Sequence, residues 1–446
     1  MFFRDFDRVA NSPLRSDALA VIETALDAAI PARTTQKKVV LNGDILLVDG
    51  QSYDLKQFDR IRILGAGKAS YPIALALENI LGDKLTDGVL VIKKGDERKL
   101  KKVRVIEGSH PVPDASSVEA GVAMLEFAES CGERDLIFAP ITGGATSLAT
   151  VPLPGLALED LEIMNELVLK SGANIREMNV VRRHLCKLKG GRLASITQPA
   201  ILITLTLDTA LPGMPWPDMC LPDPATSDDA VSVMRQYGIW EQAPAKVRDF
   251  LQAANPKMET VKDFTGFKCQ MVFVGDPVTM CQAAAQKASE LGYTPLYLAS
   301  RMHGEARETG KCIAGITEEI LQRNTPVAVP CAIITSGECN VTINGTHGRG
   351  GPNQEFAISF ADQIWSGSNW VCVAVDTDGT DGPTDWAGGI VDGRTRGRAR
   401  ELGVRLEDAV FSHDCGTLLE QLGDSLVTGH TGTNLQHLRV VLIGKD

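Results

Sequence analysis

Short apolar runs rich in β-branched residues alternate with stretches of helical periodicity along most of the chain. This alternation is typical of a mainly parallel sheet that is covered by helices. Apolar residues at helical spacing predict an amphipathic helix at 15–30, and a polar, hairpin-like segment follows at 38–54. The apolar run 61–64 predicts a buried strand that leads into a helix ending near Leu81. Further strands are predicted at 88–93, 102–107, 135–141 and 200–207, and further helices at 115–130 and 158–171.

The stretch 208–228 interrupts this rhythm with five prolines and no long apolar period, which predicts a loop at a domain edge. Helical segments are expected near 228–254, and a second alternation begins at 267–275. A chain of 446 residues is too long for a single hydrophobic core. We therefore expect two domains, one at 1–240 and one at 241–446.

Composition is that of a soluble globular protein, with 44% hydrophobic and 23% charged residues. A net charge of −11 argues against nucleic acid as a partner and disfavours anionic membranes. No apolar run reaches the roughly 18–20 residues that a membrane-spanning helix needs. Acidic residues at positions 5 and 7 interrupt the segment where a signal peptide would be apolar, so we expect a cytoplasmic protein.

Ten cysteines are scattered singly, without a CxxC pair or a Cys/His spacing typical of zinc. Most lie in apolar runs, as Cys331 and Cys372 do, and are interpreted as small buried apolar side chains. The seven histidines do not cluster, and His303, His413 and His437 receive no role.

Two glycine-containing loops follow predicted strands in the first half of the chain. Gly67 and Lys68 lie in Gly65-Ala66-Gly67-Lys68, and the second loop carries Thr142, Gly143, Gly144, Thr146 and Ser147. Backbone amides and hydroxyls at the carboxyl ends of parallel strands favour a phosphate or a carboxylate. The first loop lacks the Walker A pattern, and its dinucleotide fingerprint is incomplete because Ser70 takes the third glycine position. An ordinary tight turn is the alternative explanation for each loop.

Five cations lie between Asn179 and Arg192, among them Arg182, Arg183 and Lys189, in a chain of acidic net charge. Charge runs usually form a solvated helix face. Because this run opposes the global charge, a clamp for a polyanionic substrate is the other interpretation.

The second half carries two loops rich in glycine and carboxylates, between Thr335 and Gly389. The first contains Glu338, Asn353 and Glu355, and the second contains Asp376, Asp378 and Asp381. Glycines allow close approach of an anion, and clustered carboxylates at strand ends suit Mg²⁺ shared with substrate phosphates. The spacing of the aspartates does not match an EF-hand, and a plain Asp-Gly turn is the alternative.

Taken in order, these motifs resemble the class II glycerate kinases, the family with a C-terminal MOFRL domain and the older label hydroxypyruvate reductase. Matching segments cover nearly the whole chain. They are Gly65–Ala69, Gly108–Asp114, Thr142–Leu148, Asn179–Leu193, Gly304–Glu308, Gly337–Glu338, Gly350–Glu355, Thr377–Gly388 and Thr428–Asn434.

The resemblance implies an N-terminal Rossmann-like three-layer α/β sandwich and a C-terminal α/β domain of MOFRL type, with the active site in the cleft between them. It implies transfer of the γ-phosphoryl group of ATP to the 2-hydroxyl of D-glycerate with Mg²⁺, and a chain compatible with a homodimer. Lys68 would neutralise the transferred group, and Arg182, Arg183 and Lys189 would hold the substrate. Glu338, Asp378 and Asp381 would face Mg²⁺ or the acceptor hydroxyl.

Some positions depart from the family pattern. Leu207-Asp208-Thr209 and Pro217-Asp218-Met219-Cys220 replace two of its segments, and Pro352 stands where arginine is common. These changes motivate a second hypothesis, a paralogue that binds a sugar acid with lost or altered chemistry. A third is NADPH-dependent reduction of hydroxypyruvate, because Lys93 and Lys94 follow the second predicted strand, where a 2′-phosphate is bound in some dinucleotide folds.

Overall fold

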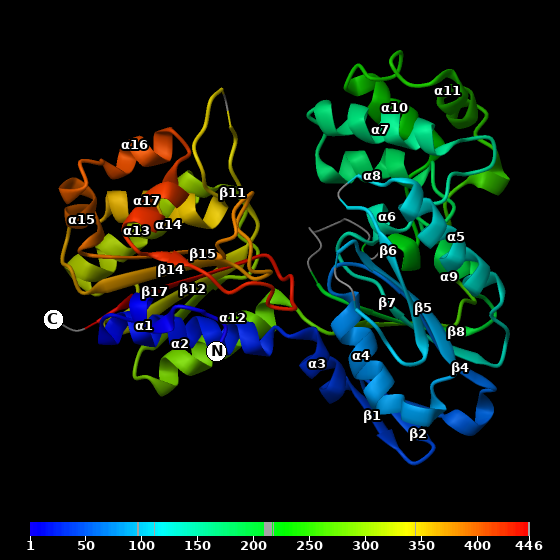
Figure 1. Cartoon of the computed structure of the whole chain (residues 1–446), viewed down its shortest axis with the longest axis horizontal. Coiled ribbons are helices and arrows are strands. Elements are labelled where there is room, and N and C mark those ends of the chain that lie inside the picture. Colours follow the sequence, from blue (N-terminus) through cyan, green and yellow to red (C-terminus); the bar gives the residue numbers. More distant parts are fainter. Residues whose placement is uncertain (96–97, 111, 209–215, 217, 344, 445–446) are drawn as a thin grey trace. The chain divides into compact units, whose positions relative to one another are not determined.

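The computed structural model describes residues 1–95, 98–110, 112–208, 216, 218–343 and 345–444. The chain forms two compact units. The N-terminal unit is Pro31–Val274, and the C-terminal unit combines Met1–Ile30 with Gly275–Asp446. Each unit is built on a six-stranded sheet with helices packed against it (Figure 1), so the predicted fold class of two α/β domains is confirmed.

The sheet of the N-terminal unit is parallel throughout and has the order β6-β5-β4-β7-β8-β9. When the six strands of this sheet are numbered in chain order, the arrangement is 3-2-1-4-5-6, as in doubly wound nucleotide-binding sheets. In such sheets the crossover direction reverses between the first and fourth strands. Here that reversal lies between β4 and β7, and ligands of such sheets bind at the carboxyl ends of those two strands. The strands are β4 (Arg60–Ala66), β5 (Asp87–Lys93), β6 (Val103–Gly108), β7 (Asp135–Pro140), β8 (Ile201–Thr206) and β9 (Cys269–Phe273).

The predicted strands and helices of this unit agree with the structure to within two residues, because each has strong apolar periodicity. One apolar core lies under α5 and α9 and includes Leu64, Val91 and Met124, and a second core joins α7, α8, α10 and α11. A small antiparallel sheet of β1–β3 occupies the predicted hairpin region. The elements are α3 (Pro31–Lys38), β1 (Val39–Asn42), β2 (Ile45–Val48), β3 (Gln51–Asp54), α4 (Ser70–Leu81), α5 (Ala115–Glu129), α6 (Ala145–Leu148), α7 (Leu158–Lys170), α8 (Ile175–Arg183), α9 (Arg192–Ile196), α10 (Ser227–Gln236) and α11 (Ala245–Gln252).

The sheet of the C-terminal unit is mixed, in the order β10-β12-β17-β14-β15-β16. β17 runs antiparallel to both β12 and β14, so the end of each of these strands pairs with the start of β17. Gly337 and Asp376 are both in register with His437, which brings three loops to one edge of the sheet. The strands are β10 (Thr294–Ala299), β12 (Cys331–Gly337), β14 (Trp370–Asp376), β15 (Gly388–Asp392), β16 (Ser425–Leu426) and β17 (His437–Ile443), with a separate pair β11 (Gly304–Glu305) and β13 (Cys339–Asn340).

Helices cover both faces of this second sheet (Figure 1). α13 and α14 lie on one face over a core that includes Phe356 and Phe360, whereas α2 and α12 pack together on the other face. The helices are α1 (Phe6–Val9), α2 (Pro13–Ala28), α12 (Pro277–Glu290), α13 (Ala306–Arg323), α14 (Pro352–Gln363), α15 (Thr395–Glu401), α16 (Leu406–Phe411) and α17 (Cys415–Gln421).

The unit boundaries differ from the expected division at residue 240. β9 was expected to open the second domain, but it pairs in parallel with β8 and completes the first sheet. The first amphipathic helix, α2, instead packs on β14 and β17 of the C-terminal unit. Both differences arise from long-range pairing, which periodicity along the chain does not encode.

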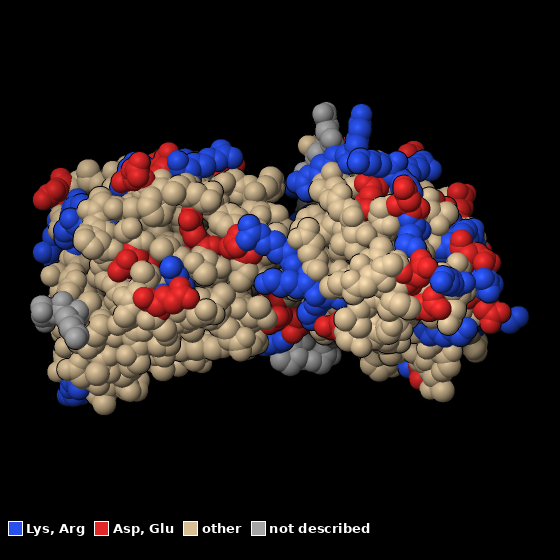
Figure 2. Space-filling model, turned by 90° about the horizontal axis from the view of Figure 1, so that it is seen from below, with Lys and Arg blue, Asp and Glu red and all other residues tan. Residues whose placement is uncertain are grey.

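Charge is distributed over both units. On the face seen in Figure 2, lysine and arginine side chains lie among aspartate and glutamate side chains. Among the helices that the structure describes, none is long and apolar enough to cross a membrane.

Candidate functional site

Two loops meet at the carboxyl ends of β4 and β7. Lys68 N donates to Gly143 O at 2.9 Å, and Ala69 N donates to the Thr142 hydroxyl at 3.0 Å. Gly67 has a φ of +137°, and a Cβ there would lie 2.1 Å from Thr142 Oγ1, so only glycine permits this approach. The structure therefore brings together the predicted residues Gly67, Lys68, Thr142, Gly143 and Gly144, while Thr146 and Ser147 follow on α6.

Cationic side chains surround these loops. Lys68 and Lys93 are exposed, and Lys93 ends β5. The His110 ring lies beside Gly144, because a Cβ on Gly144 would meet His110 Cδ2 at 3.0 Å and Lys68 Cγ at 3.3 Å. Burial, together with the charges of Lys68 and Lys93, lowers the pKa of His110 to about 4. This edge of the sheet thus presents positive charge and a neutral imidazole, which suits an anion.

The predicted cation clamp is divided between different partners. Arg183 is buried and lies 3.6 Å from Asp218 and 3.4 Å from Asp223. Arg192 donates to the carbonyls of Arg183, Cys186, Lys189 and Met258. These two arginines stabilise the conformation of the 183–192 segment through internal partners. This differs from both sequence interpretations, a solvated helix face and a clamp in which every cation faces the substrate.

Arg182 and Lys189 line a cavity of only about 10 Å³, which has room for no more than a single water molecule. Arg182 donates to Asn165 Oδ1 at 2.8 Å, and burial lowers its pKa. Asn179 lies half-buried on α8. The role of these residues as a substrate clamp stays a prediction. Residues 209–215 and 217 of the altered segment lie outside the described residues.

Acidic side chains gather at the edge of the C-terminal sheet. His437 Nε2 lies 3.7 Å from Glu338 Oε1 and 3.6 Å from Asp376 Oδ2. Arg439 Nη2 lies 2.7 Å and the Cys339 amide 3.3 Å from His437 Nδ1, so this nitrogen accepts and the proton resides on Nε2. Burial and the positive charge of Arg439 lower the pKa of His437 well below its usual value, which keeps the ring neutral. Burial, and then the charge of Asp378, raise the pKa of Asp376.

The two predicted catalytic aspartates have different surroundings. Asp378 is half-buried and accepts from the amide and hydroxyl of Thr380, at 2.9 and 2.8 Å. Asp381 is fully buried and accepts from Asn353 N, Asn353 Nδ2 and Gln354 N at 2.9–3.0 Å. Burial raises the pKa of Asp381 to about 6. The geometry favours a positioning role for Asp381, because its oxygens already hold the first turn of α14.

This arrangement also changes the expectation for Asn353. Helix N-termini bind anions through free amides. The amides of Asn353 and Gln354 donate to Asp381, so the first turn of α14 is already capped by a carboxylate. Asn353 is completely buried and supports this cap.

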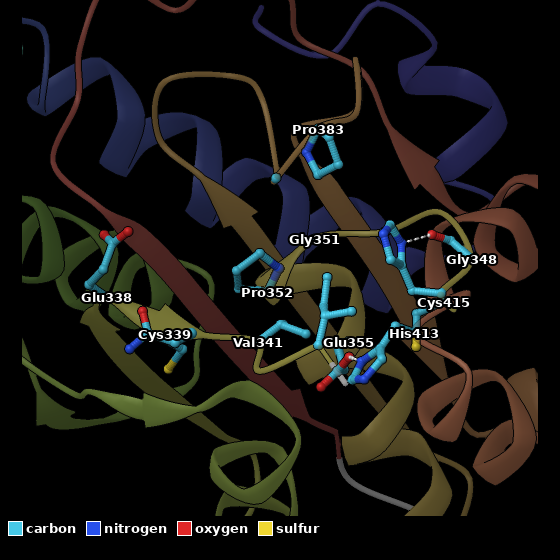
Figure 3. A pocket seen from close by; sticks show the side chains of 15 residues that line it. Glu338, Cys339, Val341, Gly348, Gly351, Pro352, Glu355, Pro383, His413 and Cys415 are labelled. Carbon is cyan, nitrogen blue, oxygen red and sulfur yellow. Dashed lines mark hydrogen bonds and ion pairs between the residues drawn. The ribbon is translucent and has the colours of Figure 1, made fainter. Parts of the chain in front are cut away.

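Glu355, on the same helix, lines a pocket of about 320 Å³ within the C-terminal unit (Figure 3). Its Oε2 is 2.8 Å from His413 Nδ1. Glu338 also lines this pocket and lies apart from Glu355, at the left of the view in Figure 3. The other lining residues are Cys339, Asn340, Val341, Ile343, His347, Gly348, Gly350, Gly351, Pro352, Gly382, Pro383 and Cys415.

Sequence reasoning gave no site role to His110, His413 or His437. The register of β17 places His437 opposite Asp376, but this pairing is not visible in a single sequence. His110 did carry a signal, because it lies in Gly108–Asp114, one of the segments that resemble the family.

Metal-ligand chemistry is present at the acidic edge, since Glu338, Asp376 and Asp378 offer hard oxygen ligands. Within the described residues, however, no group of three or more His, Cys, Asp or Glu side chains is gathered closely enough to hold a metal ion by itself. Mg²⁺ is commonly bound by one or two carboxylates together with substrate phosphates. The residues fit that mode rather than a cage made only of protein ligands.

Comparisons with known proteins agree with this architecture. Residues 17–252 match a domain of unknown function, DUF4147, and residues 331–437 match the MOFRL family. A glycerate 2-kinase of Pyrococcus horikoshii is 35% identical over 438 residues, covering 96% of this chain and 97% of the relative. A D-glycerate 2-kinase of Thermotoga maritima is 33% identical over 439 residues, covering 96% and 98%.

A putative hydroxypyruvate reductase of Agrobacterium vitis is 36% identical over 392 residues, covering 86% and 87%. The crystal structure of the Thermotoga maritima glycerate kinase has a TM-score of 0.84 at 32% identity, covering 96% of this chain and 98% of that one. The crystal structure of the Pyrococcus horikoshii PH0495 protein also has a TM-score of 0.84, at 35% identity, covering 98% and 99%. By domain content, sequence and fold, this chain belongs to the glycerate kinase family with DUF4147 and MOFRL domains.

Proposed function

We propose that this protein transfers the γ-phosphoryl group of ATP, with Mg²⁺, to the 2-hydroxyl of a small sugar acid, most simply D-glycerate, to give 2-phosphoglycerate. The observation that carries the proposal is the cationic edge of the N-terminal sheet. Among the described residues, no ion-pair or hydrogen-bond partner is found for the ammonium groups of Lys68 and Lys93. An anionic substrate would supply the missing negative charge at the position where doubly wound sheets bind ligands.

Phosphoryl transfer depends mainly on positioning and charge neutralisation, with little covalent chemistry for the protein to perform. In this proposal Lys68 offsets charge on the transferred group, and His110, held neutral, donates or accepts a hydrogen bond. The loop amides at Gly143 and Gly144 add donors to anionic oxygens.

Mg²⁺, when bound, would neutralise charge on the nucleotide phosphates. Glu338, Asp376 and Asp378 are the residues that would hold it. Burial, and then the charge of Asp378, raise the pKa of Asp376, and a divalent cation would offset this repulsion between the carboxylates. Asp381 supports this edge through α14 and needs no contact with the metal.

The decisive test is an assay of ADP release over D-glycerate and other three- and four-carbon hydroxy acids, with and without Mg²⁺. Lys68→Met is expected to lower kcat/KM by about 10²–10³-fold, as the loss of one charge-stabilising donor typically does. Lys94→Met is the matched control, because Lys94 lies at the same sheet edge but is paired with Asp114 at 2.6 Å. The control is expected to remain within about threefold of the wild type.

Absence of Mg²⁺-dependent ADP release with every acid of this set would remove the proposal. A parallel assay of NADPH oxidation with hydroxypyruvate tests the reductase alternative, which the exposed Lys93 and the name of the Agrobacterium vitis relative motivate. Binding of the acids without turnover would favour a paralogue with lost chemistry.

A further inference from the structure

The pocket of the C-terminal unit contains a buried carboxylate with an unused oxygen. Glu355 is 2% exposed, and its Oε2 is paired with His413. No hydrogen-bond partner is present for Oε1 in the part of the chain that the structure describes. A buried oxygen without a donor is costly, and a ligand with donor groups would relieve that cost.

The pocket is constructed by several independent restraints. The loop that follows β13 projects beyond the sheet (Figure 1), and Thr342 at its start is held by the Glu305 carboxylate. Its returning arm is fixed by the turn after α16, where Gly348 N donates to Ser412 O and Arg349 N donates to Asp414 Oδ1. Both ends of the loop are thus tied to ordered elements.

The same turn positions the partner of Glu355. His413 has a φ of +53°, in the left-handed region that residues other than glycine rarely adopt. This backbone conformation presents the imidazole to Glu355, as Figure 3 shows. A strained residue that orients a buried carboxylate beside a pocket is typical of a functional site.

The remaining lining decides which ligand fits. Val341, Ile343, Pro352 and Pro383 supply apolar surface, and glycines 348, 350, 351 and 382 expose backbone. A carboxylate repels phosphate, so Glu355 does not suit the phosphate-binding role predicted from the sequence. Vicinal hydroxyl groups donate to a carboxylate, as the ribose of a dinucleotide does in doubly wound folds.

We propose that this pocket binds the nucleoside part of the nucleoside triphosphate, with Glu355 accepting hydrogen bonds from the ribose hydroxyls. Glu338 lines the same pocket but lies apart from Glu355 (Figure 3), so the phosphates would extend toward the carboxylates that we assign to Mg²⁺. His413 acts as a positioning residue that fixes the carboxylate. This inference rests on the proposed use of ATP and adds where its sugar is recognised.

Calorimetry on the full-length protein tests the proposal with three probes: Mg-ATP, Mg-2′,3′-dideoxy-ATP and Mg-tripolyphosphate. The wild type is expected to bind ATP about 10–100-fold more tightly than dideoxy-ATP, the range for hydrogen bonds to a charged group. Glu355→Gln keeps the shape of the side chain, and it should weaken ATP binding until the two nucleotides bind equally. Binding of tripolyphosphate should not change.

Two further variants separate recognition from folding. His413→Asn introduces a residue that tolerates the left-handed backbone but lacks the imidazole ring. This variant should also reduce the preference for ATP over dideoxy-ATP. Glu319→Gln, an exposed carboxylate paired with Arg323 on α13, is the matched control and should behave like the wild type.

Equal weakening of all three probes by Glu355→Gln would overturn the ribose assignment, as would a wild type that does not distinguish ATP from dideoxy-ATP. In either case ATP-dependent phosphorylation of the acid could persist, so only the subsite would fail. Absence of any Mg-ATP binding would overturn both the subsite and the proposed kinase function.

Discussion

At the scale of single residues, His110 is placed where two positive charges oppose its protonation. The imidazole has a pKa near 6.5 in an unfolded chain and about 4 in the folded protein. Between these values the unfolded state binds the proton and the folded state does not, so stability rises with pH. Above about pH 6.5 the ring is neutral in both states and the folded protein keeps its full stability. As the pH falls from 6.5 toward 4, protonation of the unfolded state progressively reduces the free energy of unfolding.

We predict that His110→Gln reduces the loss of thermal stability between pH 6.5 and pH 4. Melting temperatures measured by circular dichroism across this range provide the check, with the exposed His303→Gln as the control for removal of a histidine. An unchanged acid dependence in the His110 variant would contradict the environment described for this ring.

Residue types alone indicated the glycine- and carboxylate-rich loops, but they did not indicate which of the aspartates has which role. Asp378 and Asp381 are equivalent in the sequence pattern, since each is followed directly by glycine in one loop. In the fold Asp381 accepts hydrogen bonds from residues 353 and 354 of α14, which lie 28 and 27 positions earlier, whereas Asp378 accepts from Thr380 in its own loop. Which carboxylate supports structure and which faces ligand thus depends on contacts that local pattern does not contain.

At the scale of elements, β9 also depends on long-range contacts that the local sequence pattern does not contain. Its apolar character is visible in the sequence, but its assignment to a sheet depends on pairing with β8, 67 residues earlier. α11 likewise contributes Val247 and Leu251 to the apolar core shared with α8 and α10. A division at residue 240 would therefore remove one strand and one core helix from the N-terminal unit.

We predict that a fragment comprising residues 31–274 is soluble and melts cooperatively, whereas residues 31–240 aggregate. Without β9, the apolar strand β8 becomes an exposed edge that can pair with other molecules. Size-exclusion chromatography and thermal melting of both fragments decide the matter. Residues 31–266 isolate the effect of β9, and a melt equal to that of 31–274 would show that the strand contributes nothing.

At the scale of the whole molecule, the chain begins in one unit, crosses to the other, and returns. Periodicity predicted the first helix but not that it belongs with residues 275–446. Besides its apolar packing, α2 carries a buried ion pair: Arg15 is fully buried, with Nε 2.7 Å from Asp392 Oδ2 and Nη1 2.8 Å from Asp424 Oδ1. These charged hydrogen bonds join the N-terminal segment to residues 377 and 409 positions away.

Removal of one partner from a buried ion pair typically costs about 3–5 kcal/mol, because the remaining charge stays buried. We predict the lower limit, about 3 kcal/mol, for Arg15→Met. Asp392 keeps Arg394 at 3.1 Å, and Asp424 keeps Arg398, so the two carboxylates are not left without a cation. Urea denaturation followed by tryptophan fluorescence measures the change, since Trp365, Trp370 and Trp386 all lie in the C-terminal unit.

The variant Arg405→Met, at an exposed arginine of the same unit, is the control and should change stability by less than about 0.5 kcal/mol. Combining Arg15→Met with Asp392→Asn and Asp424→Asn should recover part of the loss, because the buried negative charge is then removed together with its partner. If the triple variant were less stable than Arg15→Met alone, the cost would arise from lost packing of α2. Arg394 and Arg398 are partly exposed and compensate the two buried carboxylates only in part, so the geometry instead predicts that incompletely compensated negative charge accounts for most of the loss.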